Sequence, residues 1–323
     1  MKGKAKSYLV VGAGISGLLV ASRLSRSGAR VKVVEKGRGF GGRMATRRME
    51  GARLDHGAQF MTVRTEGFGK WVDEWIEKGV IREWFRKAPW DSSPEGHARY
   101  CGISGMTDVG KALGAELDVD RAVRLSGVEW SGSGWSADGE GGVRYEADRL
   151  ILSPPLPQSL VLLEDSGVVL PDADLRELRE IDYEPSLAGL LVLDGPSGLP
   201  EPGGIKPESE IVSWIGDNSR KGISPEVSAV TVHSTPGFAR KYWDAPNEER
   251  LPILVREAEK YLKARVESSA IHRWRYNVPQ KVWKEKFYWS DEASLGLIGD
   301  AFGGPRIEGS ALSGLALADH LGA

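Results

Sequence analysis

Three glycines and one acidic residue near the start of the chain have the types and the spacing that bind a dinucleotide. Gly12, Gly14 and Gly17 form a Gly-x-Gly-x-x-Gly pattern, and Glu35 follows further along. In this pattern the first glycine permits a tight turn, the second lets the backbone approach a pyrophosphate, and the third lets a helix pack closely on a strand. The carboxylate of Glu35 would accept hydrogen bonds from an adenosine ribose and repel a 2′-phosphate. The motif therefore predicts FAD or NAD rather than NADP.

These residues require a strand–helix–strand unit, and the flanking sequence predicts one. Apolar residues favour a strand at 8–11, a helix at 18–24 and a second strand at 31–34, which ends at Glu35. A helix that begins at the glycines directs its free N–H groups at the phosphates. The neighbours expected to contact the nucleotide with them are Ala13, Ile15, Ser16 and Lys36.

Two further elements favour FAD over NAD. Gly42 and Arg43 lie in a glycine-rich loop, where Arg43 places a permanent charge within reach of a pyrophosphate or a flavin. Near the end of the chain, Asp300 follows a predicted strand at 294–299, and a helix is predicted over 311–321 with its opening residues just before it. The N–H groups at that opening would stabilise the negative charge of a reduced flavin. The cofactor residues expected in this region are Gly299, Asp300, Glu308, Gly309, Ser310 and Ala311.

The basic loop has a simpler interpretation as well. The alternative to a cofactor-binding loop is a solvated surface segment without a ligand, and the sequence alone leaves both interpretations open. The residues concerned are Arg38, Arg43, Arg47 and Arg48.

The rest of the chain predicts a second, sheet-rich domain inserted into a discontinuous α/β domain of Rossmann type. Amphipathic or apolar patterns predict helices at 71–84 and 251–266, and a strand that starts at 55–59. Further strands are expected at 122–130, 144–153, 188–193, 211–215 and 229–234. We assign the cofactor-binding domain to residues 1–70, 101–165 and 290–323, and the substrate-binding domain to 71–100 and 166–289.

Candidate substrate-binding residues concentrate in the inserted segments. In an extended strand, His272, Trp274 and Tyr276 share one face, which suits a flat heterocycle but equally suits an ordinary core. Tryptophans are also enriched there, either around an aromatic cavity or as core residues. Other side chains expected to join the site are His233, Trp214, Asn218 and Lys221. The enriched tryptophans are Trp71, Trp75, Trp84, Trp90, Trp214, Trp243, Trp274, Trp283 and Trp289.

Composition argues against several classes of protein. The formal net charge of −2, without a basic block, disfavours nucleic acid or an anionic membrane as the main partner. The single cysteine, Cys101, excludes an intrachain disulfide, and no Cys/His spacing typical of zinc occurs, so no metal is expected. Lysines 2, 4 and 6 before an apolar stretch imitate a secretory signal, but the glycine spacing is that of a nucleotide loop. We expect a cytoplasmic protein, either a monomer or a homodimer.

Taken together, these motifs resemble the flavin amine oxidase family, which has the glutathione-reductase-type FAD fold, and most closely its renalase-like branch. The resemblance is carried by the N-terminal glycines, by 41–44, by 54–60, by the proline-ended strand before Pro154 and by 299–314. It implies that Val123 meets the adenine through its backbone, and that Ala58 and Gln59 lie near the flavin ring. We expect the FAD to be noncovalent, since Cys101 lies in an unsuitable part of the chain and His56 suits a structural role better.

The resemblance also implies an activity: oxidation of misreduced 2- or 6-dihydro isomers of NAD(P)H by hydride transfer to flavin N5, with dioxygen reduced to hydrogen peroxide. The small-molecule substrate would meet His272, Trp274, Tyr276, His233 and Gln59. One alternative is an FAD-dependent amine oxidase, with Trp274 and Tyr276 as an aromatic cage for a mono- or polyamine. Another is a non-catalytic flavin-binding redox sensor.

Overall fold

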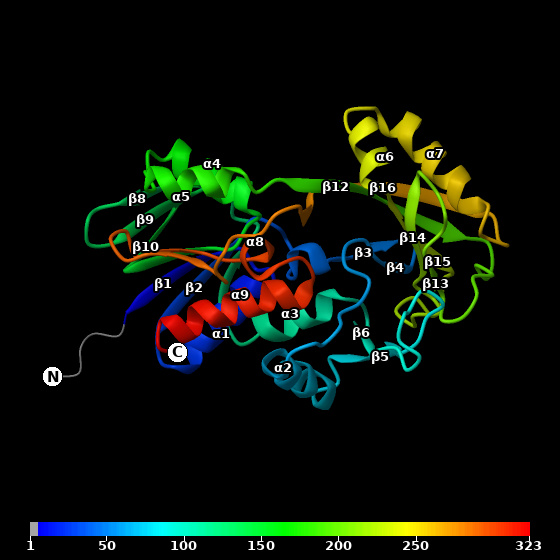
Figure 1. Ribbon diagram of the computed structural model, residues 1–323, viewed down its shortest axis with the longest axis horizontal. Coiled ribbons are helices and arrows are strands. Elements are labelled where there is room, and N and C mark those ends of the chain that lie inside the picture. The colour runs from blue at the N-terminus through cyan, green and yellow to red at the C-terminus, as the bar shows by residue number, and fades with distance from the viewer. Residues whose placement is uncertain (1–5) are drawn as a thin grey trace. The chain divides into compact units, whose positions relative to one another are not determined.

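The computed structural model describes residues 6–323, and these form two compact units (Figure 1). Unit 1 contains the described residues up to Gly42, together with Gly110–Asp182 and Pro279–Ala323. Unit 2 contains Arg43–Val109 and Tyr183–Val278. The expected fold class, a discontinuous α/β domain with a sheet-rich second domain, is confirmed.

The boundaries differ from those expected. Residues 43–70 and 101–109 pack within unit 2, whereas 166–182 and 279–289 pack within unit 1. Trp283 and Trp289 therefore belong to unit 1.

A six-stranded sheet in the order β17-β18-β11-β1-β2-β7 forms the centre of unit 1. Strands β1, β2, β7, β11 and β18 run parallel, and β17 pairs antiparallel with β18. Leu9 and Val10 of β1 are buried, as expected for a strand covered on both faces. The strands are β1 (Ser7–Val11), β2 (Arg30–Glu35), β7 (Asp118–Arg121), β11 (Arg149–Leu152), β17 (Tyr288–Ser290) and β18 (Leu295–Leu297).

Helices from opposite ends of the sequence lie side by side in unit 1. The C-terminal helix α9 (Ile307–His320) packs along α1 (Ile15–Arg26), as Figure 1 shows. A Cβ on Gly314 would lie 2.3 Å from the carbonyl oxygen of Ser16, so glycine is what permits this close approach. The end of the chain is thereby brought to the nucleotide motif at its beginning. The remaining helices of the unit are α4 (Leu156–Asp165), α5 (Asp172–Arg179) and α8 (Asp300–Gly303).

Two strands expected in unit 1 differ in the structure: one is shorter than expected and the other is divided into two strands. The strand expected at 122–130 starts only at Leu125, because Ala122 has φ 59° and cannot continue β7. The stretch 144–153 forms two strands, one of which joins a separate three-stranded antiparallel sheet. The strands of this small sheet are β8 (Leu125–Trp130), β9 (Trp135–Gly139) and β10 (Val143–Ala147).

A five-stranded sheet, in the order β13-β14-β15-β12-β16, forms the centre of unit 2. Helices α6 and α7 cover part of it through a core that includes Leu191, Val232 and Leu254. The hairpin of β3 and β4 packs on it through Leu54, which contacts Leu190 and Val192. The elements are β12 (Tyr183–Leu193), β13 (Gly204–Ile205), β14 (Val212–Asp217), β15 (Ala229–Ser234), β16 (Val266–Pro279), β3 (Thr46–Met49), β4 (Ala52–Asp55), α6 (Pro236–Lys241) and α7 (Asn247–Glu259).

Other expectations for unit 2 need correction. The helix expected at 71–84 is α2 (Glu66–Glu77), and the chain then forms β5 (Ile81–Phe85), which pairs with β6 (Arg99–Gly102). The helix expected at 251–266 ends at Glu259, and a turn at 260–265 leads into β16, which begins at Val266. Asp55 ends β4 instead of starting a strand. A short 3-10 turn (Gly42–Met44) and α3 (Thr107–Gly114) span the divisions between the units.

Candidate functional site

The glycines of the N-terminal motif in unit 1 have three different surroundings. Gly12 has φ 99°, and a Cβ there would lie 2.5 Å from Oγ of Ser153. A Cβ on Gly17 would lie 2.2 Å from the carbonyl oxygen of Gly12. By contrast, a Cβ on Gly14 would meet nothing within 4 Å, and Gly14 caps α1 without a side-chain hydrogen bond. The turn and the helix packing thus use the outer glycines, and the space beside Gly14 is left open at the positive end of α1.

Glu35 holds the loops around this space together. Its carboxylate accepts hydrogen bonds from the backbone N–H of Ala13 (2.7 Å) and of Gly37 (2.6 Å). The N–H of Val123 donates to the Glu35 carbonyl oxygen (3.1 Å), so the segment predicted to meet adenine lies beside the predicted ribose acid. Each carboxylate oxygen retains capacity for a further hydrogen bond. Lys36 is directed elsewhere, since its Nζ donates to Oε1 of Gln158 (2.8 Å).

The C-terminal element of the predicted cofactor site differs in detail from its expected form. Gly299 has φ 132° and donates its N–H to Oγ of Ser313 (2.9 Å). Asp300 and Glu308 are buried. Helix α9 begins at Ile307, four residues before the expected start, and the N–H of Ser310 already donates to the carbonyl of Arg306 (3.2 Å). The free N–H groups of the helix therefore belong to residues 307–309, and those of Ser310 and Ala311 lie past the positive end.

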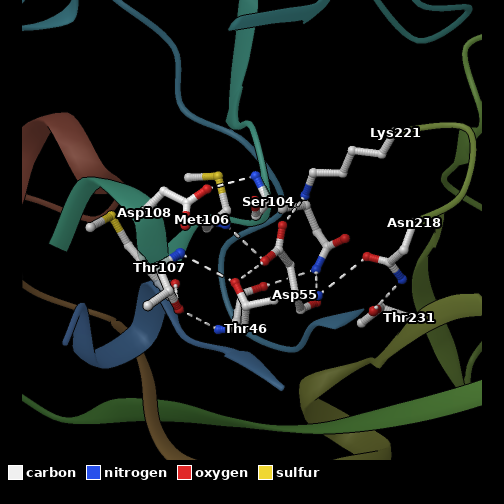
Figure 2. A network of polar contacts seen from close by, with 12 residues as sticks. Thr46, Asp55, Ser104, Met106, Thr107, Asp108, Asn218, Lys221 and Thr231 are labelled. Carbon is white, nitrogen blue, oxygen red and sulfur yellow. Dashed lines mark hydrogen bonds and ion pairs between the residues drawn. The ribbon is translucent and has the colours of Figure 1, made fainter. Parts of the chain in front are cut away.

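Asp55 is the centre of a buried polar network in unit 2 (Figure 2). Its carboxylate accepts hydrogen bonds from Nζ of Lys221 (2.5 Å), Oγ1 of Thr46 (2.5 Å) and the N–H of Met106 (2.9 Å). Its own N–H donates to Oδ1 of Asn218 (3.2 Å). Both oxygens of the carboxylate are thus occupied.

Lys221 and Asn218, expected as substrate-contacting residues, serve this network. Lys221 is completely buried, and its Nζ lies 5.2 Å from the centre of the Trp84 ring, a cation–π distance. Nδ2 of Asn218 donates to Oγ1 of Thr231 on β15 (3.0 Å). Asp55 itself is not among the site residues that the sequence predicts. The signal that could have found it is an acidic residue at the end of the short strand β4.

The network also fixes the segment that follows Asp55. Nε2 of Gln59 donates to the carbonyl oxygens of Asp55 (2.5 Å) and Gly57 (3.1 Å). The N–H of Ala58 donates to the carbonyl of Arg43 (2.9 Å). A Cβ on Gly57 would lie 1.9 Å from that same carbonyl oxygen, so only glycine permits this packing.

Three rings from distant parts of the sequence form a cluster in unit 2. The ring centres of His56 and His272 are 4.6 Å apart, those of His272 and Trp274 are 4.3 Å apart, and His56 stacks on Trp274 at 5.3 Å. Nε1 of Trp274 donates to the carbonyl oxygen of His56 (2.7 Å). Along β16, His272, Trp274 and Tyr276 are half-buried while Arg273 and Arg275 are exposed, so the predicted alternation of faces is present. We call His56, His272 and Trp274 the ring cluster.

Two further predicted residues lie beyond these rings. The Tyr276 ring packs against Tyr183 at 5.7 Å. The guanidinium of Arg43 donates to the carbonyl oxygens of Tyr276 (3.0 Å) and Asn277 (3.2 Å) at the end of β16. Within unit 2, Arg43 therefore anchors the strand that carries the ring cluster.

Three histidines of unit 2, His56, His233 and His272, have pKa values lowered toward the neutral form. Burial, with a smaller contribution from nearby cationic groups, lowers the pKa of His56 to about 3. Burial lowers the pKa of His233 to about 4. It also lowers the pKa of His272, and the charge of Arg47 adds to the effect. Neutral imidazoles can both donate and accept a hydrogen bond, whereas protonated ones only donate.

Several buried polar atoms near these residues have no hydrogen-bond partner in the described part of the chain. A Cβ on Gly216 would lie 2.7 Å from Nε1 of Trp214 and 2.9 Å from Oε1 of Gln59. An unpaired donor and an unpaired acceptor thus both lie next to this glycine. Trp214 also packs against Phe60 and Trp90, as core tryptophans do. Since unpaired buried polar atoms are costly, they are typical of functional sites. The atoms are Nδ1 of His56, Oε1 of Gln59, Nε1 of Trp84, Nε of Arg99, Nε1 of Trp214 and Nε2 of His233.

Family models match most of the chain. A model for an NAD(P)-binding Rossmann-like domain matches residues 10–74, and a model for flavin containing amine oxidoreductases matches residues 90–321. The chain belongs to the flavin-containing amine oxidoreductase family. Renalase of Mus musculus is 24% identical over 289 residues, which cover 83% of this chain and 84% of the renalase.

Solved structures share the fold of this family over nearly the whole chain. Wild-type putrescine oxidase bound to putrescine superposes with a TM-score of 0.75 at 16% identity, covering 98% of this chain and 99% of that one. Cyclohexylamine oxidase from Brevibacterium oxydans IH-35A gives a TM-score of 0.75 at 11% identity, covering 99% and 100%. The protein is an FAD-dependent oxidoreductase of this family.

The geometry of unit 1 fits FAD. The open space beside Gly14 at the uncapped end of α1 suits a pyrophosphate, and the remaining acceptor capacity of Glu35 suits ribose hydroxyls. No helix in the described part of the chain is long and apolar enough to cross a membrane.

Proposed function

We propose that the protein oxidises 2- or 6-dihydro isomers of NAD(P)H to NAD(P)⁺ and that dioxygen is the final electron acceptor. The similarity to renalase across most of both chains supports a substrate of this class. The observation that carries the proposal is the ring cluster, in which two imidazoles and an indole lie within 5.3 Å of one another and the imidazoles are neutral.

The proposed reaction needs little acid–base chemistry from the protein. The dihydropyridine loses one hydride and becomes aromatic, so no substrate proton has to be removed first. Bound FAD would supply the hydride acceptor; the two electrons and the proton of that hydride, together with one further proton from solvent, would reduce dioxygen to hydrogen peroxide. The chain's own task is to hold the donor carbon in the reactive orientation.

The ring cluster and its neighbours suit that task. The flat faces of Trp274 and His272 would stack a pyridine ring. Neutral His56 and His233 would hydrogen-bond polar groups on the ring, and their unpaired nitrogens are the atoms that require a partner. Gln59 would complete the pocket with its unpaired Oε1. Tyr276 has a weaker claim, because its ring packs on Tyr183.

We further propose that FAD is bound noncovalently. Cys101 is buried on β6 and the ring of His56 is packed against His272 and Trp274, which makes both poor anchors. The proposed contacts in unit 1 come from the glycine motif, the ribose acid, the adenine segment and the C-terminal element.

An amine oxidase is the second candidate, since the structural neighbours include a putrescine oxidase and a cyclohexylamine oxidase. Trp274 would then form part of a cage for a neutral amine. An anaerobic mixing experiment distinguishes the candidates: purified FAD-loaded protein is mixed with NADH, with the 2- and 6-dihydro isomers and with a panel of amines, and air is admitted afterwards. The proposal predicts rapid loss of flavin absorbance with the isomers only, followed by hydrogen peroxide. Bleaching by amines would replace it with the second candidate, and no bleaching by any donor would indicate a redox sensor.

A pair of variants tests the role of the ring cluster. Trp274→Ala should lower the rate of flavin reduction by the isomers at least tenfold. Trp243→Ala is the matched control, since Trp243 contacts Arg273 and Arg275 on the opposite face of the same strand. Equal rates in the two variants would remove the ring cluster from the proposed site.

A further inference from the structure

The charged groups around the ring cluster are unevenly engaged. Arg273 donates to the carbonyl oxygen of Trp243 and lies over its ring, and Arg43 donates to two carbonyls of β16. Lys221 is paired with Asp55. Their charges are thus already held by other groups of unit 2.

Arg47 differs from these cations. It is exposed on β3, and among residues 6–323 its guanidinium has no hydrogen-bond or ion-pair partner. Arg47 pairs in register with Leu54, whose side chain packs on Leu190 and Val192 of β12, the strand next to β16. Cross-strand partners lie on the same face of a hairpin, so Arg47 shares the face that is turned toward the sheet.

The effect of Arg47 on the histidines agrees with this placement. Burial is the largest cause of the lowered pKa of His272, and the charge of Arg47 is the next. Arg47 also lowers the pKa of His56. The backbone also links the two segments, since the N–H of His56 donates to the carbonyl oxygen of Ala45 (3.3 Å), two residues before the exposed Arg47.

The carboxylate next to His56 in the sequence is not available to a ligand. Besides burial and the neighbouring histidines, the groups that lower the pKa values of His56 and His272 are the arginines Arg47 and Arg273. The carboxylate of Asp55, next to His56 in sequence, is occupied by Lys221, Thr46 and Met106. Within residues 6–323, a ligand here thus meets an unpaired cation, Arg47, and an Asp55 carboxylate that is already occupied.

We propose that Arg47 is a specificity-determining residue that binds a phosphate group of the substrate and so selects nucleotides over uncharged dihydropyridines and over cationic amines. The inference rests on the proposed function, because it takes the ring cluster as the place of the pyridine ring. In a nicotinamide nucleotide one ribose separates the ring from the phosphate, so the phosphate lies beside the ring cluster and not within it. A guanidinium binds phosphate with paired, charge-assisted hydrogen bonds, which explains why an exposed arginine suffices.

The test compares three substrates that share one dihydropyridine isomer: the riboside without phosphate, the mononucleotide and the dinucleotide. Each is mixed with wild type, Arg47→Ala, Arg47→Gln and Arg48→Ala. Arg48 is the matched control, since it is the next residue on the same strand, is also exposed, and pairs with Arg53 on the opposite face. Flavin content and the circular dichroism spectrum of each variant are measured first.

The expected result is a fall in kcat/KM of about tenfold or more for the two phosphate-bearing substrates in both Arg47 variants. The loss should lie in KM, with kcat unchanged, and it should shrink as salt rises from 50 to 300 mM. The riboside and the Arg48→Ala variant should change less than about twofold.

Other outcomes have separate meanings. An equal loss for the riboside, or no loss for the nucleotides, overturns the role of Arg47 and leaves the proposed function intact. If none of the three dihydropyridines reduces the wild-type flavin, the proposed function itself fails.

Discussion

Removal of the Lys221 charge provides the sharpest test of the buried network. In Lys221→Met the Asp55 carboxylate loses its ion-pair partner in a place where neither side chain is more than 1% exposed. Breaking a buried pair by removing one partner typically costs about 3–5 kcal/mol, because the remaining charge stays buried. Asp55 keeps its hydrogen bonds from Thr46 and Met106, so we expect the lower end, about 3 kcal/mol.

The double variant Asp55→Asn/Lys221→Met should be more stable than the sum of the single effects predicts. It leaves no buried charge, and the asparagine carbonyl can still accept a hydrogen bond from Met106. We expect a coupling energy of roughly 2 kcal/mol between the two positions. Lys70→Met is the control, because the Lys70–Glu66 pair is highly exposed and should change stability by less than about 1 kcal/mol.

The assay is urea unfolding of the FAD-loaded protein, followed by far-ultraviolet circular dichroism. With a slope of about 3 kcal/mol per molar urea, Lys221→Met should lower the midpoint by about 1 M. A loss below about 1 kcal/mol in this variant, or additive single effects in the double variant, would refute the reasoning that the pair stabilises the segment after Asp55 as a charged unit.

Three further predictions concern pH and the cofactor loop. Burial lowers the pKa of His56 to about 3 and that of His233 to about 4. In the unfolded chain a histidine has a pKa of about 6.5, so below this pH the unfolded chain binds protons that the folded chain does not. The stability that depends on neutral histidines is therefore complete above pH 6.5 and is lost as pH falls. His233→Asn should therefore flatten the dependence of unfolding free energy on pH by about 1.1 kcal/mol per pH unit between pH 6 and 4.5, and equal slopes in urea titrations would contradict this. Gly17→Ala should abolish folding or flavin retention, since its Cβ would lie 2.2 Å from a backbone oxygen, whereas Gly14→Ala should fold normally and lose only FAD affinity, as measured by flavin absorbance per chain. Glu35→Gln should also lower flavin content, because one of its two loop N–H groups loses a carboxylate acceptor; unchanged flavin content would exclude the ribose role.

The strand–helix–strand unit around Gly12 could be predicted because its signals are local. The glycines at 12 and 14 separate the end of β1 at Val11 from the start of α1 at Ile15, and Glu35 ends β2. Local signals also explain the errors. Ala122 adopts a positive φ that nothing in its residue type predicts. Tyr261 and Leu262 continue the apolar pattern of the helix, although they lie in the turn between α7 and β16.

The Asp55 network could not be predicted, since Lys221 and Asn218 lie far from Asp55 in the sequence. Asp55 and Lys221 are 166 positions apart, and each belongs to a polar residue type that is normally exposed. Both side chains are buried because β4 packs on the sheet of unit 2, a contact between segments that are distant in the sequence. His56 illustrates the same point, because its partner rings come from β16.

The ion pair between Asp55 and Lys221 bears directly on the choice between the two candidate substrates. A site for an ammonium group needs an acceptor with negative charge, and the carboxylate next to His56 already has three donors. The histidines add no charge, since burial keeps them neutral, and the guanidinium of Arg47 adds an unpaired positive one. An amine would therefore have to enter as the neutral base, at a cost that rises as pH falls below the amine's own pKa. A phosphate-bearing dihydropyridine meets no such cost, and for this reason the electrostatics of unit 2 favour the nucleotide over the amine.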